Sequence, residues 1–354
     1  MIETIAQDPR GTTSLWGKAD EPELFLAFCF EWAKYMKEGP GFVTQLPVSV
    51  DGSCNGLQLY SLLMRDPVGA LATNVLPTAR PQDIYQDVAD ATIRRLEADG
   101  SDMARAWLRF GVDRKATKRA TMVVPYSGTR WACRDYVREW FLSELKTRGM
   151  DNPFGFEETF KPPHFLADLV WESISDVVGE AQKAMSWFRD VARICIDNGA
   201  PIRWTTPTGF VVKQAYETWQ SQSVKTVIGD VIRQHKIRYG SGKLCKRKGC
   251  NGVAPNRIHS DDGAIVTKTV LKNSSSRVLF QSYIHDAALG LSPDMPMMVE
   301  HLLESVIEIY SQDLMQDFLS ELTHYLPIGV TLPEPPERGN LDIELIRQSQ
   351  YFYS

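Results

Sequence analysis

Two aspartates, each placed after an apolar, β-branched run, have the surroundings that metal chemistry needs. Asp51 follows residues 42–50 and precedes Gly52, and Asp286 comes just after residues 278–284. A carboxylate at a strand end can reach solvent, and a glycine beside it lets a backbone carbonyl approach the same point. Both are oxygen donors of the kind that Mg²⁺ prefers. Taken alone, the motif at Asp51 fits equally well a strand-to-helix turn with an aspartate cap, and the His-Asp pair that ends at Asp286 is common.

A cationic helix face lies between these aspartates in the chain. Arg114 and Lys118 are four residues apart, so they share one face of a helix, and Tyr126 lies at the end of that helix. Such a face could pair with a triphosphate, although most cationic faces are only solvated. A fourth motif, His-Ser-x-Asp, begins at His259; a lone histidine is more often a structural residue than a ligand.

The order of these four motifs resembles that of the polymerase motifs of the DNA polymerase I superfamily. Within that superfamily the chain is most similar to the single-subunit DNA-directed RNA polymerases of bacteriophages and mitochondria. The resemblance extends over nearly the whole chain from about residue 20, and outside the motifs it covers residues 25–32, 65–69, 74–77, 82–85, 204–210, 254–256 and 349–354.

The resemblance implies a nucleotidyl transfer that uses two metal ions. Asp51, Asp286 and the backbone carbonyl of Gly52 match the ligands of a pair of Mg²⁺ ions. One ion would lower the pKa of the primer 3′-hydroxyl, and the other would neutralise charge on the leaving pyrophosphate. The substrates implied are NTPs, a DNA template and an RNA transcript.

The resemblance also assigns the nucleotide-binding residues. Arg114 and Lys118 match cations that grip the triphosphate, and Lys118 would also protonate the pyrophosphate. Tyr126 matches the residue that senses the sugar 2′-hydroxyl, with His259 close by, and Trp131 falls where the family has an aromatic residue near the template base.

Gly56 bears on the choice between RNA and DNA synthesis. DNA polymerase relatives carry a glutamate at this place, five residues after the first aspartate, and its side chain crowds the ribose 2′ position. A glycine leaves room for the hydroxyl, so we expect ribonucleotides to be used.

A basic segment occupies the place of the family's promoter-binding β-hairpin. This segment, residues 233–248, lacks acidic residues, contains Gly240-Ser241-Gly242 and looks like a hairpin. Its charge would bind DNA phosphates whatever the base sequence. The candidate DNA-binding residues are Arg233, Lys236, Arg238, Lys243, Lys246, Arg247 and Lys248. Structural zinc needs four ligands, and Cys245, Cys250 and His235 supply at most three, so we expect none.

The elements that would position these residues follow from hydrophobic spacing and from Gly and Pro breaks. We expect helices over residues 22–38, 82–98, 101–124 and 295–325, and one or two helices over 165–198. The expected strands are 42–50, a pair within 204–212, and 278–284.

The fold implied is α+β: the palm and fingers of a right-hand polymerase, with a small antiparallel palm sheet surrounded by helices and with the N-terminal domain and thumb absent. A second polypeptide would then complete a split enzyme, unless the chain is a fragment; the early Met1 favours the split. The palm face left uncovered should be apolar. The expected domains are a lead-in (1–20), palm (21–100), fingers (101–200), fingers with the specificity hairpin (201–255), and palm with a C-terminal foot (256–354).

Composition limits the alternatives without choosing among them. The 354 residues carry a net charge of −5, so no positive field covers the whole protein, and any nucleic-acid binding must be local. No apolar run is long enough for a membrane span, and the six cysteines are scattered, which fits a reducing compartment. We expect the cytoplasm of a phage-infected cell rather than a mitochondrion.

Two other functions stay open at this point. One is a DNA polymerase of the same superfamily, against which Gly56 argues, and the other is a non-catalytic nucleic-acid-binding subunit.

The chain also departs from the family pattern in two places. Leu59 stands where a histidine is usual, and Pro125-Tyr126-Ser127-Gly128 adds a proline and moves the glycine that usually follows the tyrosine by one residue.

Overall fold

The computed structural model describes residues 1–155 and 158–354. Most of these residues are helical. The helices are α1 (Ile2–Gln7), α2 (Thr13–Trp16), α3 (Pro22–Glu38), α4 (Asn55–Met64), α5 (Pro67–Ala72), α6 (Ile84–Asp99), α7 (Asp102–Phe110), α8 (Arg114–Met122), α9 (Arg130–Arg148), α10 (Lys161–Val177), α11 (Gly179–Asp197), α12 (Lys246–Ser275), α13 (Met295–Tyr310) and α14 (Leu314–Thr323), with short 3₁₀ turns η1 (Gly39–Gly41), η2 (Val124–Tyr126) and η3 (Ile343–Gln348).

The strands form three small antiparallel sheets. They are β1 (Val48–Val50), β2 (Ile202–Thr205), β3 (Val211–Gln214), β4 (Glu217–Ile228), β5 (Val231–Leu244), β6 (Gln281–Ile284) and β7 (Ala287–Gly290). One sheet has the order β1-β7-β6, and the other two are the hairpins β2-β3 and β4-β5. The molecule is thus mixed helix and sheet, as expected.

The first predicted strand is much shorter than expected. Only Val48–Val50 pairs with β7, while residues 42–47 lie outside any strand. Pro47 directly precedes the strand, and proline has no N–H to donate to a ladder. The prediction of a strand from residue 42 was therefore wrong, but its end, which delivers Asp51, was right. The later strand is likewise only Gln281–Ile284, not 278–284.

Two predicted long helices are each divided. Gly111, with φ of +92°, ends α7, and the Asp113 side chain caps α8 by accepting from the backbone N–H groups of Lys115 and Ala116. Asp313 likewise caps α14 after α13 has ended. The single helices expected over 101–124 and 295–325 were thus wrong, because the caps were not recognised. The helix over 22–38 is confirmed as α3, and residues 165–198 fall into α10 and α11.

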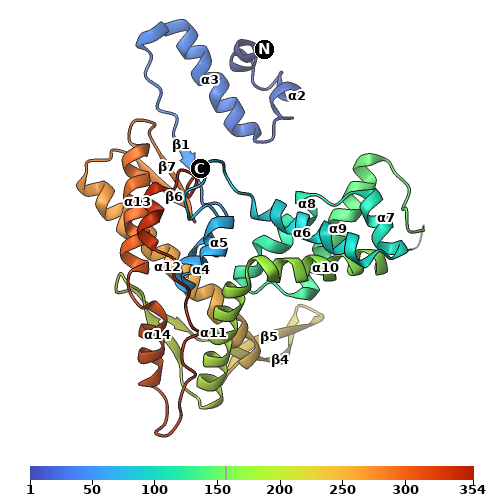
Figure 1. The fold of residues 1–354 in the computed structure, drawn as a ribbon, viewed down its shortest axis with the longest axis vertical. Coiled ribbons are helices and arrows are strands. Elements are labelled where there is room, and N and C mark those ends of the chain that lie inside the picture. Colours follow the sequence, from blue (N-terminus) through green and yellow to red (C-terminus); the bar gives the residue numbers. More distant parts are fainter. Residues whose placement is uncertain (156–157) are drawn as a thin grey trace.

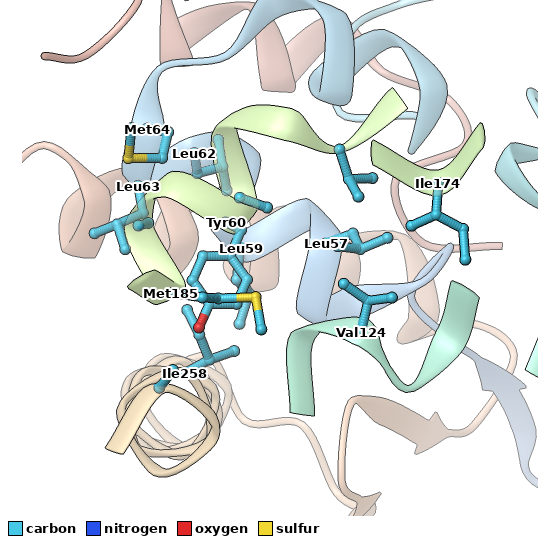
Figure 2. Packing of buried hydrophobic residues seen from close by; sticks show 14 of the residues in the cluster. Leu57, Leu59, Tyr60, Leu62, Leu63, Met64, Val124, Ile174, Met185 and Ile258 are labelled. Carbon is cyan, nitrogen blue, oxygen red and sulfur yellow. The ribbon is translucent and has the colours of Figure 1, made fainter. Parts of the chain in front are cut away.

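The core surrounds α4, in which every residue is buried. A helix that is apolar almost all round belongs inside a protein. Figure 2 shows Val124 of η2 beside Leu57, and Met185 of α11 and Ile258 of α12 beside Tyr60. Because α4 begins four residues after Asp51, this packing fixes the segment that carries the aspartate.

Two parts of the chain stand away from this core. Figure 1 shows α1–α3 set apart from the remaining helices, and the β4-β5 hairpin projecting to the right in the lower half of the view. Helix α3 exposes Phe28, Trp32 and Tyr35 among other apolar side chains. The domain boundary expected between residues 255 and 256 falls inside α12; the domain limits stay a prediction. Within 1–155 and 158–354, no helix combines the length and apolar character needed to cross a bilayer.

Candidate active site

Asp51 and Asp286 lie at the same end of the β1-β7-β6 sheet. Val50 of β1 pairs with Ala288, and Ile284 of β6 pairs with Ala287, so Asp51 and the β6-β7 turn that holds Asp286 are neighbours. The backbone of Asp51 is also held by Ser354, through N–H···O distances of 3.1 and 3.0 Å in the two directions. The sheet therefore brings together two carboxylates that are far apart in the sequence.

The two carboxylates repel one another. Burial, and after it the negative charge of Asp51, raises the pKa of Asp286 to about 6. The turn that places Asp286 there has a left-handed residue, His285, with φ of +57°. Negative charge is thus concentrated at the end of the sheet.

This arrangement suits a hard divalent cation. A Cβ added to Gly52 would lie 3.2 Å from Asp286 Oδ2 and 3.0 Å from Gln58 Oε1, so the glycine lets these oxygens approach the main chain. Gln58 Oε1 is buried and has no hydrogen-bond partner among the residues that the structure describes. Among the residues described, no three His, Cys, Asp or Glu side chains form a cluster. Two carboxylates with backbone, water and phosphate oxygens are a set typical of Mg²⁺.

A cavity of about 750 Å³ opens beside the aspartates. Asp51 and Asp286 line it, and so do Arg114 and Lys118 of α8. Arg114 Nε donates to Asp83, and its guanidinium lies 5.0 Å from the ring centre of Tyr85. Lys118 has an exposed side chain and no ion-pair partner within the described part of the chain. One cavity thus holds both the acidic pair and the cationic helix face.

Tyr126 is held between α4 and α12. Its ring lies 4.8 Å from the ring of His259, centre to centre, on α12. A Cβ on Gly56 would lie 2.9 Å from Tyr126 Oη and 2.8 Å from Pro125 Cγ. The space beside Gly56 is thus filled by Tyr126 and Pro125, so the glycine allows the tyrosine hydroxyl to approach α4.

The unusual Pro125-Tyr126-Ser127-Gly128 segment has a partner in α12. Pro255 inside that helix has no N–H, so the carbonyl of Asn251, four residues earlier, loses its usual donor. Ser127 Oγ donates to this carbonyl at 2.6 Å. The serine that departs from the family pattern thereby joins the end of η2 to α12, directly next to Tyr126.

The basic segment expected to be one hairpin is divided between two elements. Arg233, Lys236, Arg238 and Lys243 lie on β5, whereas Lys246, Arg247 and Lys248 form the first turn of α12. The hairpin turn is at residues 229–230, and residues 240–242 lie within β5 opposite a bulge in β4. The hairpin thus begins before the basic segment, because its first strand is β4.

The cations in the first turn of α12 have different surroundings from those on the hairpin. Lys246 pairs with Asp197 at 2.7 Å. Arg247 and Lys248 line a second cavity, of about 520 Å³, on the other side of Tyr126. These two residues therefore share a cavity with Tyr126 of the candidate nucleotide site.

Some residues differ from what the sequence suggested. Trp131 is exposed, lies 5.0 Å from the guanidinium of Arg134, and does not line the main cavity. Asp83 and Tyr85 do line it but were not predicted as site residues; the only signal was their place in the segment 82–85 that resembles the family. Lys225 was missed too, because its face of the hairpin depends on the register.

Comparison with known proteins identifies what the chain is similar to. The model of the DNA-dependent RNA polymerase family matches residues 1–329. The whole chain is 29% identical to the T7 RNA polymerase of Escherichia phage T7 and covers 45% of that protein. Nearly all of it, 99%, is 30% identical to DNA-directed RNA polymerase 2, chloroplastic/mitochondrial, of Arabidopsis thaliana, of which it covers 34%.

A third relative is the mitochondrial DNA-directed RNA polymerase of Mus musculus, 30% identical over 99% of the chain and 30% of that protein. The chain spans less than half the length of each of these three relatives.

Proposed function

The chain belongs to the family of DNA-dependent RNA polymerases, and from that premise we propose that it transfers ribonucleotides from NTPs to an RNA 3′-hydroxyl under the direction of a DNA template. The observation that carries the proposal is the single cavity that Asp51, Asp286, Arg114 and Lys118 line. An acidic pair facing a cationic pair is what a triphosphate with its counter-ions requires.

The acidic side of the cavity is the metal site in this proposal. Asp51, Asp286 and the Gly52 carbonyl would hold two Mg²⁺ ions, which would lower the pKa of the 3′-hydroxyl and neutralise charge on the pyrophosphate. The raised pKa of Asp286 supports this assignment, because a cation would relieve the repulsion from Asp51. The sheet holds both carboxylates in place before substrate arrives.

The cationic side binds the triphosphate. Arg114 keeps nitrogens beyond the one that donates to Asp83, and these can reach phosphate oxygens. Lys118 carries a compact ammonium that faces the cavity, so it can both attract the phosphates and give a proton to the pyrophosphate.

Selection of the sugar is assigned to Tyr126. Its hydroxyl lies at the cavity, close to Gly56, and its ring packs on His259. A hydroxyl held in this way can bond to a ribose 2′-hydroxyl, and a deoxyribose leaves it unpaired, which costs affinity. Ribonucleotides should therefore be preferred over deoxyribonucleotides.

The larger architecture in this proposal is the palm and fingers of a right-hand polymerase, with the β4-β5 hairpin binding DNA phosphates. A second polypeptide would supply the rest of the family fold. The exposure of Phe28 and Trp32 on α3 supports a partner of this kind. Action in the cytoplasm of a phage-infected cell stays a prediction.

Extension of an RNA primer on a single-stranded DNA template with Mg²⁺ tests the proposal. The assay compares rNTPs with dNTPs, for the chain alone and for the chain co-expressed with the neighbouring reading frames of its genome. We expect extension with rNTPs that Asp286→Asn abolishes. A preference for dNTPs would indicate a DNA polymerase of the same superfamily, and silence in every combination would leave a non-catalytic binding subunit.

A further inference from the structure

The tip of the β4-β5 hairpin is apolar on both faces. Val227, Ile228, Val231 and Ile232 flank the two-residue turn, and their exposed fractions are 69%, 65%, 56% and 68%. The pair Ile228–Val231 points to one face and the pair Val227–Ile232 to the other, because successive residues of a strand alternate. Four exposed aliphatic side chains at the end of a projecting hairpin (Figure 1) need a partner.

The stem next to this tip is cationic on one of its faces. The register places Lys225 opposite Gln234, Lys236 opposite Ser223, and Arg238 opposite Ser221, so these six side chains share the face of Val227 and Ile232. Serine and glutamine supply hydrogen-bonding groups between the cations. From residue 219 to 239 the only acid is Asp230, in the turn itself. This face is complementary to a row of phosphates.

Together these features identify the partner. Resting on the proposed function, we propose that the hairpin lays its cationic stem face along duplex DNA while the aliphatic tip enters the base stack and unstacks a base pair. Proteins that kink or open a duplex insert aliphatic wedges between base steps while cations hold the backbone. A protein partner explains the tip less well, because the face of Val227 and Ile232 continues directly into the cations of the stem.

The shape of the hairpin fits this role. Gly229 has φ of +62°, as glycine favours at the first position of a two-residue hairpin turn, so the end is narrow. Both strands are exposed along nearly all of their length. A long, narrow and exposed ribbon can reach into a duplex without moving the core.

A fluorescence assay with the full chain tests the proposal. The probe is a synthetic AT-rich duplex with 2-aminopurine, whose fluorescence rises when the base unstacks, placed at successive positions. The test variant changes Val227, Ile228, Val231 and Ile232 to threonine, which keeps β-branching and strand propensity but removes the apolar character. The matched control is Asp230→Asn, which alters the same turn and keeps all four aliphatic side chains.

We expect the unaltered chain and Asp230→Asn to raise the fluorescence about threefold or more at one position, and the threonine variant to leave it within about 1.2-fold while its duplex affinity changes by less than about threefold. On a template with a pre-opened bubble, the threonine variant should extend RNA as well as the unaltered chain does.

Two results would overturn the proposal. One is a threonine variant that still unstacks the probe, and the other is an unaltered chain that never binds or unstacks it, which would assign the tip to a protein surface. The fluorescence assay needs neither nucleotides nor metal. A failure of the proposed catalytic function would appear separately, as absent extension on a primed single-stranded template.

Discussion

Asp286 is held where its charge is unfavourable. Its carboxyl is partly buried and lies beside Asp51, and these two causes, in that order, raise its pKa to about 6. Strongly shifted pKa values cluster at functional sites, where a protein needs an ionisable group in spite of the unfavourable free energy of its charge. Gly52 and Gly56 also shape this site, because each leaves room for an oxygen atom that a Cβ would displace.

Asp286→Asn should lower RNA extension without lowering the stability of the fold. We expect extension to fall roughly 10³-fold, because one of two metal-binding carboxylates is lost. The melting temperature without metal should stay unchanged or rise, because a repelled buried charge is removed. Asp294→Asn is the matched control, since Asp294 makes no side-chain cap bond at the start of α13. An Asp286→Asn protein that keeps more than about a tenth of its activity would contradict the metal assignment.

Ser127 should act as a positioning residue for Tyr126. Ser127→Ala removes the hydroxyl that binds the Asn251 carbonyl and leaves the backbone, with φ of +66°, as strained as before. One such bond contributes about 1 kcal/mol, so we expect the rNTP-to-dNTP ratio of kcat/KM to fall about fivefold.

Two further variants check this assignment. Ser127→Gly relieves the backbone strain but also lacks the hydroxyl, so it should lower the ratio in the same way. Ser311→Ala, whose hydroxyl binds Ile307 within its own helix, should not. An unchanged ratio in Ser127→Ala, with only a lower melting temperature, would make the bond purely structural.

Among the elements, the β4-β5 hairpin differs most from the rest of the chain. It is cationic on one face although the whole protein carries a net charge of −5. DNA binding should therefore be local and sensitive to salt.

The charge of the stem predicts a salt dependence. Each phosphate contact contributes about 0.9 to the slope of log K against log salt for B-DNA. Changing Lys225, Lys236 and Arg238 to glutamine should reduce that slope by about 2 to 3. Measuring duplex affinity at several salt concentrations checks this. The control changes Lys34 and Lys183, which pair with Glu31 and Glu180 within their own helices, and should leave the slope as it is. An unaltered slope in the triple variant would mean that the stem does not contact phosphates.

For the whole molecule, the packing of α12 on α13 links the sheet to the helical core. Lys272 donates to Glu304 at 2.7 Å and to Glu308 at 2.6 Å, and Lys268 donates to Glu308 at 2.9 Å. Hydrogen bonds from Lys272 are the largest cause that lowers the pKa of both glutamates below the ordinary value of 4.5.

Stability should depend on pH through this network. Carboxylates with a lower pKa in the folded state stabilise the protein above their ordinary pKa, and that contribution is lost as the pH falls through the folded value. Lys272→Met should lower the free energy of unfolding by roughly 0.5–1 kcal/mol at pH 7, because the groups are partly exposed. Urea unfolding from pH 7 to pH 3 should show this difference closing below pH 4.5. A difference that stays constant would assign the effect to lost packing of the lysine stem.

The sequence by itself determined the family, the residue types at the aspartate and cationic-helix motifs, and most helices, because these depend on residue type and short-range spacing. Helix α3 and the end of β1 at Asp51 could be predicted from local periodicity and Gly-Pro breaks. The helix caps at Asp113 and Asp313 follow local rules too. They were missed because the apolar residues on both sides of each cap continue at helical spacing.

Only the tertiary structure decided how distant residues meet. The β1-β7-β6 register gives the geometry by which Asp51 meets Asp286, which the family resemblance had led us to expect. No motif indicated that Ser127 binds the carbonyl that Pro255 frees, or that the β4-β5 register places Lys225 with Lys236 and Arg238. A shift of one residue in a strand turns every side chain to the other face. These contacts depend on chain packing over long sequence separations, which residue spacing alone does not specify.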